Sequence, residues 1–229
     1  MQGCVQPALA PNINAATAQV LDKLGISLIP IADTCCGAMP YHLSNHQQAS
    51  DMMRHNIDAC WPLLQNGIEA IVSTASGCGV HLKDYGSLLA HDADYADKAS
   101  RISALCLDIS EILRAEDLTR LNVKPYKLAF HSPCTLQHGQ QLSGVVESLL
   151  VQLGFNLTGV MDGHLCCGSA GIYSILQAES ADRLRVARIK ALQADDPQCI
   201  VTANIGCLLH LQEKAEVPVK HWIELLAAD

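Results

Sequence analysis

The 229-residue sequence is poor in aromatic and basic residues. It has two Trp, two Phe and five Tyr, and its 15 Lys and Arg are outnumbered by 23 Asp and Glu, for a formal net charge of -8. Nucleic-acid binding depends on clustered basic side chains that contact phosphates. An acidic chain without a basic run is therefore a poor candidate for that class of protein.

Long apolar runs are also missing. No stretch of about 18 apolar residues occurs, which excludes a membrane-spanning helix, and no export signal is evident at the N-terminus. A chain of this length can bury a core without disulfides. Its 11 cysteines, an odd number, are therefore expected to be buried, metal-bound or reactive thiols rather than a disulfide framework.

Common catalytic motifs are absent as well. The sequence contains no P-loop, no GxGxxG after a strand, no HExxH, no GxSxG and no CxxC redox motif. The glycine-rich segment 168–171 follows a cysteine pair, so we interpret it as a loop around a metal cluster rather than a phosphate-binding loop. No flavin or nicotinamide site is evident, and the isolated chain is not expected to be catalytic.

What the sequence does contain is a repeated cysteine pattern. A single Cys, a Cys-Cys-Gly 31 or 32 residues later and a Gly-Cys after a further 42 or 40 residues occur twice, about 130 residues apart. This is an internal duplication. The first quartet is Cys4, Cys35, Cys36 and Cys78, and the second quartet is Cys134, Cys166, Cys167 and Cys207.

Alternating helical and strand patterns in both halves predict an α/β fold with two pseudo-repeated halves, each a small parallel sheet flanked by helices. We expect a first repeat at 1–116, a connection at 117–126 and a second repeat at 127–229. Helices are expected at 13–24, 45–65, 79–90, 108–116, 143–153, 175–194 and 207–216, and strands at 26–31, 68–74, 127–131, 155–160 and 199–203.

The two halves differ at their beginnings. The expected strand 127–131 leads into Cys134, whereas only three residues precede Cys4. The first half is therefore predicted to lack its opening strand and to expose an unpaired sheet edge. This asymmetry also predicts that the chain is the C-terminal part of a longer protein.

The cysteine positions predict a metal site in each half. Ligands of parallel sheets gather beyond the carboxyl ends of the strands, where these cysteines fall, and helices that start near Cys78 and Cys207 favour thiolates. Four thiolates suit zinc or an iron–sulfur cluster. Adjacent cysteines point in different directions, which favours a cluster with separate iron corners over zinc. A vicinal disulfide or a pair of core thiols remains an alternative.

Histidines accompany both quartets. His81 and His210 each follow the last cysteine of a quartet by three residues, so they are candidate ligands on the same helical face, with a second-shell or solvated imidazole as the alternative. His131, His138 and His164 are expected to hydrogen-bond sulfur or loop carbonyls rather than to bind metal. Three cysteines without a counterpart in the other half are expected to be ordinary buried thiols: Cys60, Cys106 and Cys199.

These motifs resemble the cysteine-rich CCG domain of heterodisulfide-reductase-like proteins, which occurs in tandem in iron–sulfur subunits of flavin-linked hydroxy-acid dehydrogenases. The segments that carry the resemblance to the glycolate oxidase (glycolate dehydrogenase) iron–sulfur subunit family cover residues 3–7, 74–79, 164–171 and 202–207. Relatives with the full pattern end each set in CxxC, whereas His81 and His210 stand at that place here. The ferredoxin-like region that begins those subunits is absent from this sequence.

The resemblance implies an electron-transfer subunit with clusters of the 4Fe-4S type, held by the two quartets. A flavoprotein partner would oxidise glycolate to glyoxylate, or D-lactate to pyruvate, and this subunit would pass electrons toward quinone. It would be cytoplasmic or peripheral on the cytoplasmic face of the inner membrane. The competing hypothesis is a zinc-binding or metal-free module that docks the flavoprotein without carrying electrons.

Overall fold

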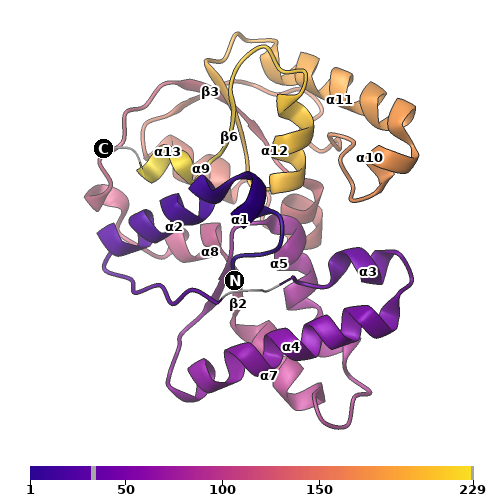
Figure 1. The fold of residues 1–229 in the computed structure, drawn as a ribbon. Coiled ribbons are helices and arrows are strands. Elements are labelled where there is room, and N and C mark those ends of the chain that lie inside the picture. Colours follow the sequence, from indigo (N-terminus) through magenta and orange to yellow (C-terminus); the bar gives the residue numbers. More distant parts are fainter. Residues whose placement is uncertain (32–34, 228–229) are drawn as a thin grey trace.

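The computed structural model describes residues 1–31 and 35–227, and its chain alternates helices with short strands (Figure 1). The first half contains α1 (Gln6–Leu9), α2 (Pro11–Lys23), α3 (Ala38–His42), α4 (His46–Gln65), β1 (Ile71–Ser73), α5 (Ser76–Lys83), α6 (Tyr85–Leu88), α7 (Ala96–Leu105), β2 (Cys106–Asp108) and α8 (Ile109–Arg114). The 3-10 turn η1 (Leu118–Arg120) leads to the second half: β3 (Lys127–His131), the π-helical turn η2 (Thr135–Gly139), α9 (Val145–Gln152), β4 (Asn156–Leu157), α10 (Tyr173–Leu176), α11 (Ala178–Gln193), β5 (Cys199–Thr202), α12 (Ile205–Gln212), β6 (Val219–His221) and α13 (Glu224–Ala227).

The second half contains a parallel sheet in the order β4-β3-β5-β6. Successive residues of β3 face opposite sides of the sheet: Leu128 and Phe130 lie in the core that includes α9, whereas Ala129 packs with Ile189 of α11. Helices therefore cover both faces, as the alternating pattern predicts, and the α/β class with small parallel sheets is confirmed.

The first half contains only the parallel pair β1-β2 among the described residues. No strand precedes Cys4, which confirms that the opening strand is missing from this sheet. The strand expected at 26–31 does not form, and that prediction is wrong. Its counterpart β4 pairs only with β3, so without an equivalent of β3 the segment 26–31 has no strand to pair with.

A cavity of about 600 Å³ lies where that missing strand would run. Its walls include Ile26 and Leu28 on one side and Ile71 and Val72 of β1 on the other. The Met1 ammonium donates a hydrogen bond to the Val72 carbonyl (2.9 Å). Met1 therefore occupies the position in the first sheet that His131 occupies in the parallel ladder of the second sheet. A strand residue rises ~3.3 Å along the strand, neighbouring strands are ~4.8 Å apart, and packed layers are ~10 Å apart, so one residue occupies ~160 Å³. The cavity therefore has room for about four residues.

This cavity gives a first prediction. Extending the chain before Met1 with Lys-Leu-Ala-Phe, the first four residues of β3, is expected to raise the Tm by roughly 2–4 °C, because about 1 kcal/mol of apolar burial should remain after the entropy of ordering the strand. The measurement is thermal unfolding followed by circular dichroism. An extension of equal length made of Ser and Gly is the control, and equal Tm values for the two extensions would contradict the prediction.

Other elements differ from expectation at their ends and in the first half. The helix expected at 79–90 begins earlier, as α5, and is interrupted at Asp84 before α6. The helix expected at 175–194 is divided into α10 and α11, and the strand expected at 155–160 shortens to β4. Six helices and strands are not among the expected elements: α1, α3, α7, β2, β6 and α13.

The two repeats share one core. The largest apolar cluster combines Ile13 and Val20 of α2 and Ile109 of α8 with residues of the second sheet. Helix α2 of the first half packs against α13, the last helix of the second half (Figure 1). In the same way, α9 of the second half packs against α8, the last helix of the first half. Because the two halves share this core, their division into separate domains at residues 117–126 stays a prediction from the sequence repeat.

In the described part of the chain, every helix is too short or too polar to cross a membrane.

Candidate functional site

The carboxyl ends of the two sheets face each other. The Ser76 backbone N–H, at the start of α5, donates to the carbonyl of Ala203, which follows β5 (3.1 Å). The ring of His221, at the end of β6, donates from Nε2 to the carbonyl of Thr74, which follows β1 (2.9 Å). The loops that carry the cysteines leave the strands at these ends.

The second quartet forms a continuous row of thiols. Cys134 follows β3, Cys166 and Cys167 lie in the loop between β4 and α10, and Cys207 lies in the first turn of α12. Each thiol influences the pKa of the next one along the row, in the order Cys134, Cys166, Cys167 and Cys207. Cys167 and Cys207 are buried, and the other two are half-buried.

The first quartet forms a similar row. Each thiol again influences the pKa of the next, in the order Cys4, Cys35, Cys36 and Cys78. A small cavity of about 50 Å³ is lined by Cys4, Cys36 and Cys78. Cys4 is exposed, so the first row is open to solvent at one end. The structure thus brings together the four cysteines that the repeat predicts in each half.

The second quartet combines raised and lowered thiol pKa values. Hydrogen bonding to neighbouring thiols and burial raise the pKa values of Cys134 and Cys167. Hydrogen bonds from Cys134 and Cys167, aided by the Gly168 backbone N–H (3.3 Å), lower the pKa of Cys166. The neighbouring Cys167 thiol and the His131 imidazole lower the pKa of Cys207 to about 6. Thiolates bind metal, so the second quartet holds two sulfurs poised for binding.

In the first quartet, three of the thiols have raised pKa values. Burial and the hydrogen bond with Cys35 raise the pKa of Cys4, and the hydrogen bond with Cys36 together with burial raises that of Cys35. The hydrogen bond from Cys35 lowers the pKa of Cys36, but that effect is outweighed by the hydrogen bond with Cys78 and by burial, which raise it to about 12. These thiols must lose protons when a metal binds.

Glycine is required in the second cysteine loop. Gly168 has a φ of +95°, and a Cβ at this position would lie 2.5 Å from the Ala181 carbonyl oxygen. Any side chain would push the loop away from α11, because backbone cannot yield as a flexible side chain can. The Cys-Cys-Gly motif therefore fixes the position of its cysteines through the glycine.

The two histidines predicted as ligands contact groups other than the thiols. His81 is buried between the rings of Tyr41 and Tyr85, with ring centroids at 5.4 and 5.7 Å. His210 lies with its Nε2 3.5 Å from the Ala181 carbonyl oxygen. Among the described residues, the one group of three or more candidate ligands within 4.8 Å of one another contains neither of them.

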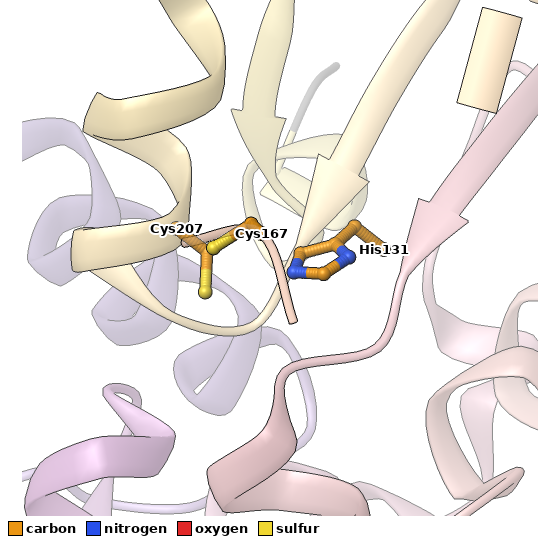
Figure 2. A group of neighbouring side chains, drawn as sticks. All are labelled: His131, Cys167 and Cys207. Carbon is orange, nitrogen blue, oxygen red and sulfur yellow. The ribbon is translucent and has the colours of Figure 1, made fainter. Parts of the chain in front are cut away.

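That group consists of His131, Cys167 and Cys207 (Figure 2). His131 was expected only as a neighbour of the second quartet, and the structure places it beside two of the sulfurs. His138 contacts a loop carbonyl as expected, since its Nε2 lies 3.4 Å from the oxygen of His164. The thiols without a repeat counterpart are buried as predicted, at Cys60, Cys106 and Cys199.

Arg188 is a functional residue that the sequence pattern did not indicate. This α11 residue is 3% exposed, and its Nε donates to Nδ1 of His131 (3.2 Å) while Nη1 donates to the carbonyls of Met161 and Asp162 (3.2 and 2.8 Å). Its Nη2 is buried without a partner among the described groups. The helix contains several arginines, and only the packing shows which of them points inward.

Comparison with known families agrees with this geometry. The chain matches the family model for the cysteine-rich CCG domain at residues 1–83 and 128–212, and each matched range contains one complete quartet. The chain belongs to the CCG cysteine-rich family. The two CCG matches coincide with the two copies of the internal repeat.

Two similar proteins are glycolate oxidase subunits. The chain is 52% identical over 228 residues to the glycolate oxidase iron-sulfur subunit of Escherichia coli (strain K12), covering 99% of this chain and 56% of that protein. It is 28% identical over 215 residues to the probable glycolate oxidase iron-sulfur subunit of Bacillus subtilis (strain 168), covering 92% and 48%. The chain therefore spans about half the length of these relatives.

Two further matches are more distant. Lactate utilization protein A of Anoxybacillus flavithermus is 24% identical, and the match covers 97% of this chain and 95% of that one. Among solved structures, a putative Asp/Glu racemase from Yersinia pestis matches with a TM-score of 0.36 at 15% identity, covering 97% of this chain and 92% of that one. Nothing about this chain is derived from the latter likeness.

Proposed function

We propose that this CCG chain is an electron-transfer iron–sulfur component of a complex that oxidises a small 2-hydroxy acid. The observation that carries the proposal is the gathering of two equivalent cysteine quartets at the carboxyl ends of two parallel sheets. The names of the relatives support it, since two are iron-sulfur subunits of glycolate oxidase and one is a lactate utilization protein.

The residues present fit an iron–sulfur cluster. Each quartet supplies four sulfurs, and the first borders a cavity. In the second, two buried donor atoms have no partner among the described groups, His131 Nε2 and Arg188 Nη2. Unpartnered buried donors cost free energy unless an acceptor reaches them, and thiolates or inorganic sulfide would be suitable acceptors.

The residues assigned to hold clusters of the 4Fe-4S type are Cys4, Cys35, Cys36 and Cys78 in the first half and Cys134, Cys166, Cys167 and Cys207 in the second. A bound cluster would supply one-electron redox chemistry. The chain's own contribution is to hold the sulfurs, to keep water from Cys167 and Cys207 by burial, and to place donors beside them. His81 and His210 are not assigned as ligands.

The partners and reaction belong to the same proposal. A flavoprotein subunit would oxidise glycolate to glyoxylate, or D-lactate to pyruvate, and electrons would pass through this subunit toward quinone. We place the complex in the cytoplasm or at the cytoplasmic face of the inner membrane. A ferredoxin-like region, as in subunits of this type, would carry further clusters.

The test is metal analysis of protein purified without exposure to air. We expect iron and acid-labile sulfide in the protein, a paramagnetic resonance signal on reduction, and no glycolate oxidation by the isolated chain. Colourless protein with zinc and no iron or sulfide would reject the electron-transfer proposal and favour a zinc-binding docking module, which the four-thiolate sites also permit. Turnover by the isolated chain would contradict the assignment of catalysis to a flavoprotein.

A further inference from the structure

Among the described residues, His131 is the one histidine that forms a group of three candidate metal ligands with cysteines of a quartet. It is the last residue of β3, is fully buried, and lies with Cys167 and Cys207 in a group whose candidate ligand atoms are within 4.8 Å of one another (Figure 2). Two thiolates and an imidazole could bind a metal together. His131 could therefore act as a ligand or as a hydrogen-bond donor.

Arg188 decides between these two roles. Its Nε–H donates to Nδ1 of His131 at 3.2 Å, and both side chains are buried. A guanidinium remains protonated and can only donate, so Nδ1 must be the acceptor. In the neutral ring the proton then lies on Nε2, and a protonated ring nitrogen has no lone pair for a metal.

Arg188 is itself held firmly in place. Its Nη1 donates to two loop carbonyls, those of Met161 and Asp162, at 3.2 and 2.8 Å. These contacts tie α11 to the segment that leads into Cys166 and Cys167. The arginine can therefore orient the imidazole in the absence of a metal.

The protonated Nε2 of His131 faces the sulfurs. It has no hydrogen-bond partner among the described groups, and the ligand atoms of His131, Cys167 and Cys207 lie within 4.8 Å of one another. We propose that His131 donates an Nε2–H···S hydrogen bond to Cys207, that Arg188 fixes the tautomer that makes this possible, and that the pair raises the reduction potential of a cluster in the second quartet.

The effect on the potential follows from charge. Reduction makes a cluster more negative, so a donor to one of its sulfurs and a nearby guanidinium stabilise the reduced state more than the oxidised state. His131 and Arg188 are positioning residues, because neither would bind iron. The statement about the potential rests on the proposed function, whereas the hydrogen bond and the tautomer do not.

The test compares variants of the whole protein. His131→Leu removes the donor, and His131→Gln places an amide N–H near the position of Nε2. We expect His131→Leu to keep its iron and to lower the reduced-to-oxidised ratio of the second cluster about tenfold at a fixed potential, which is a shift of 59 mV for a one-electron couple. His131→Gln should recover most of that shift. His91→Leu, at an exposed histidine outside both quartets, should cause none.

Nuclear magnetic resonance of ¹⁵N-labelled imidazoles gives a second readout on the metal-free chain. The His131 ring should carry its proton on Nε2, and Arg188→Met should abolish this preference.

Loss of iron from the second site in both His131 variants, or a proton found on Nδ1, would overturn the proposal in favour of a ligand role. An unchanged potential in His131→Leu would overturn the tuning role. If the wild-type protein holds no iron, the proposed function fails and the statement about the potential fails with it. The imidazole spectrum would still decide the hydrogen bond.

Discussion

Replacing Cys166 and Cys167 by serine is expected to remove most of the metal bound by the protein. These two residues connect Cys134 to Cys207 in the second row of thiols, so the double substitution takes away half of the sulfurs and separates the remaining two. Serine is a weak substitute, because its hydroxyl does not ionise near neutral pH as a thiol does. The second quartet also contains the two cysteines whose pKa values are lowered.

Cys4→Ser is expected to cause only a small loss of metal. Cys4 is exposed and no strand leads into it, whereas Cys134 follows a strand paired on both edges. Iron and acid-labile sulfide per chain, measured after anaerobic purification, compare the two variants. The matched control is Cys60→Ser with Cys199→Ser, which places serine at two buried cysteines outside the quartets. Equal losses from Cys4→Ser and from the double variant would contradict this prediction.

The free energy of unfolding is expected to fall by about 6 kcal/mol between pH 6.5 and pH 4, through two buried histidines. Burial lowers the pKa of His221 to about 4, and burial with the nearby His42 charge lowers that of His81 to about 4. Unfolded histidine has a pKa of about 6.5, so the unfolded chain binds more protons in this range. Each histidine then contributes about 3 kcal/mol, at about 1.4 kcal/mol per pKa unit.

The neutral ring of His221 has a specific structural role. Its Nε2–H donates to the Thr74 carbonyl of the first repeat, and its Nδ1 accepts from the Ile223 N–H (3.3 Å). Protonation of Nδ1 would break the second bond and bury a charge at the junction of the repeats. The stabilising effect is therefore complete above about pH 6.5 and is lost as the pH falls toward 4.

Urea unfolding at several pH values, with metal content checked at each, measures this slope. His221→Gln should halve the pH dependence, because glutamine stays neutral throughout. His91→Gln, which changes an exposed histidine, should leave it unchanged. A His221→Gln protein with the wild-type slope would contradict the prediction, whatever its stability at pH 7.

Much of the fold could be predicted because local patterns govern it. The strands β3 and β5 are short apolar runs, and β3 was predicted with its correct ends. The helix α4 was predicted almost to the residue, since Asn45 accepts a hydrogen bond from the Gln48 N–H at its start. By contrast, β2 and β6 are three-residue strands, too short for a periodic pattern to reveal.

The segment 26–31 shows the opposite case. Its apolar, β-branched residues have the local preference of a strand, yet it forms none. A strand needs a neighbour to satisfy its backbone N–H and C=O groups, and the neighbour is missing here. Local preference alone could not reveal that.

By itself, the sequence determined which cysteines form the two quartets, because duplication preserves spacing and the carboxyl ends of parallel strands bring their loops together. Only the tertiary structure decided that His131 forms a group with two of the sulfurs, and that Arg188 donates a hydrogen bond to its ring. The packing of α2 and α8 of the first half against α13 and α9 of the second half also depended on the fold. The physical reason is that spacing fixes where a residue lies along the chain, whereas burial, tautomer and charge depend on what packs against it.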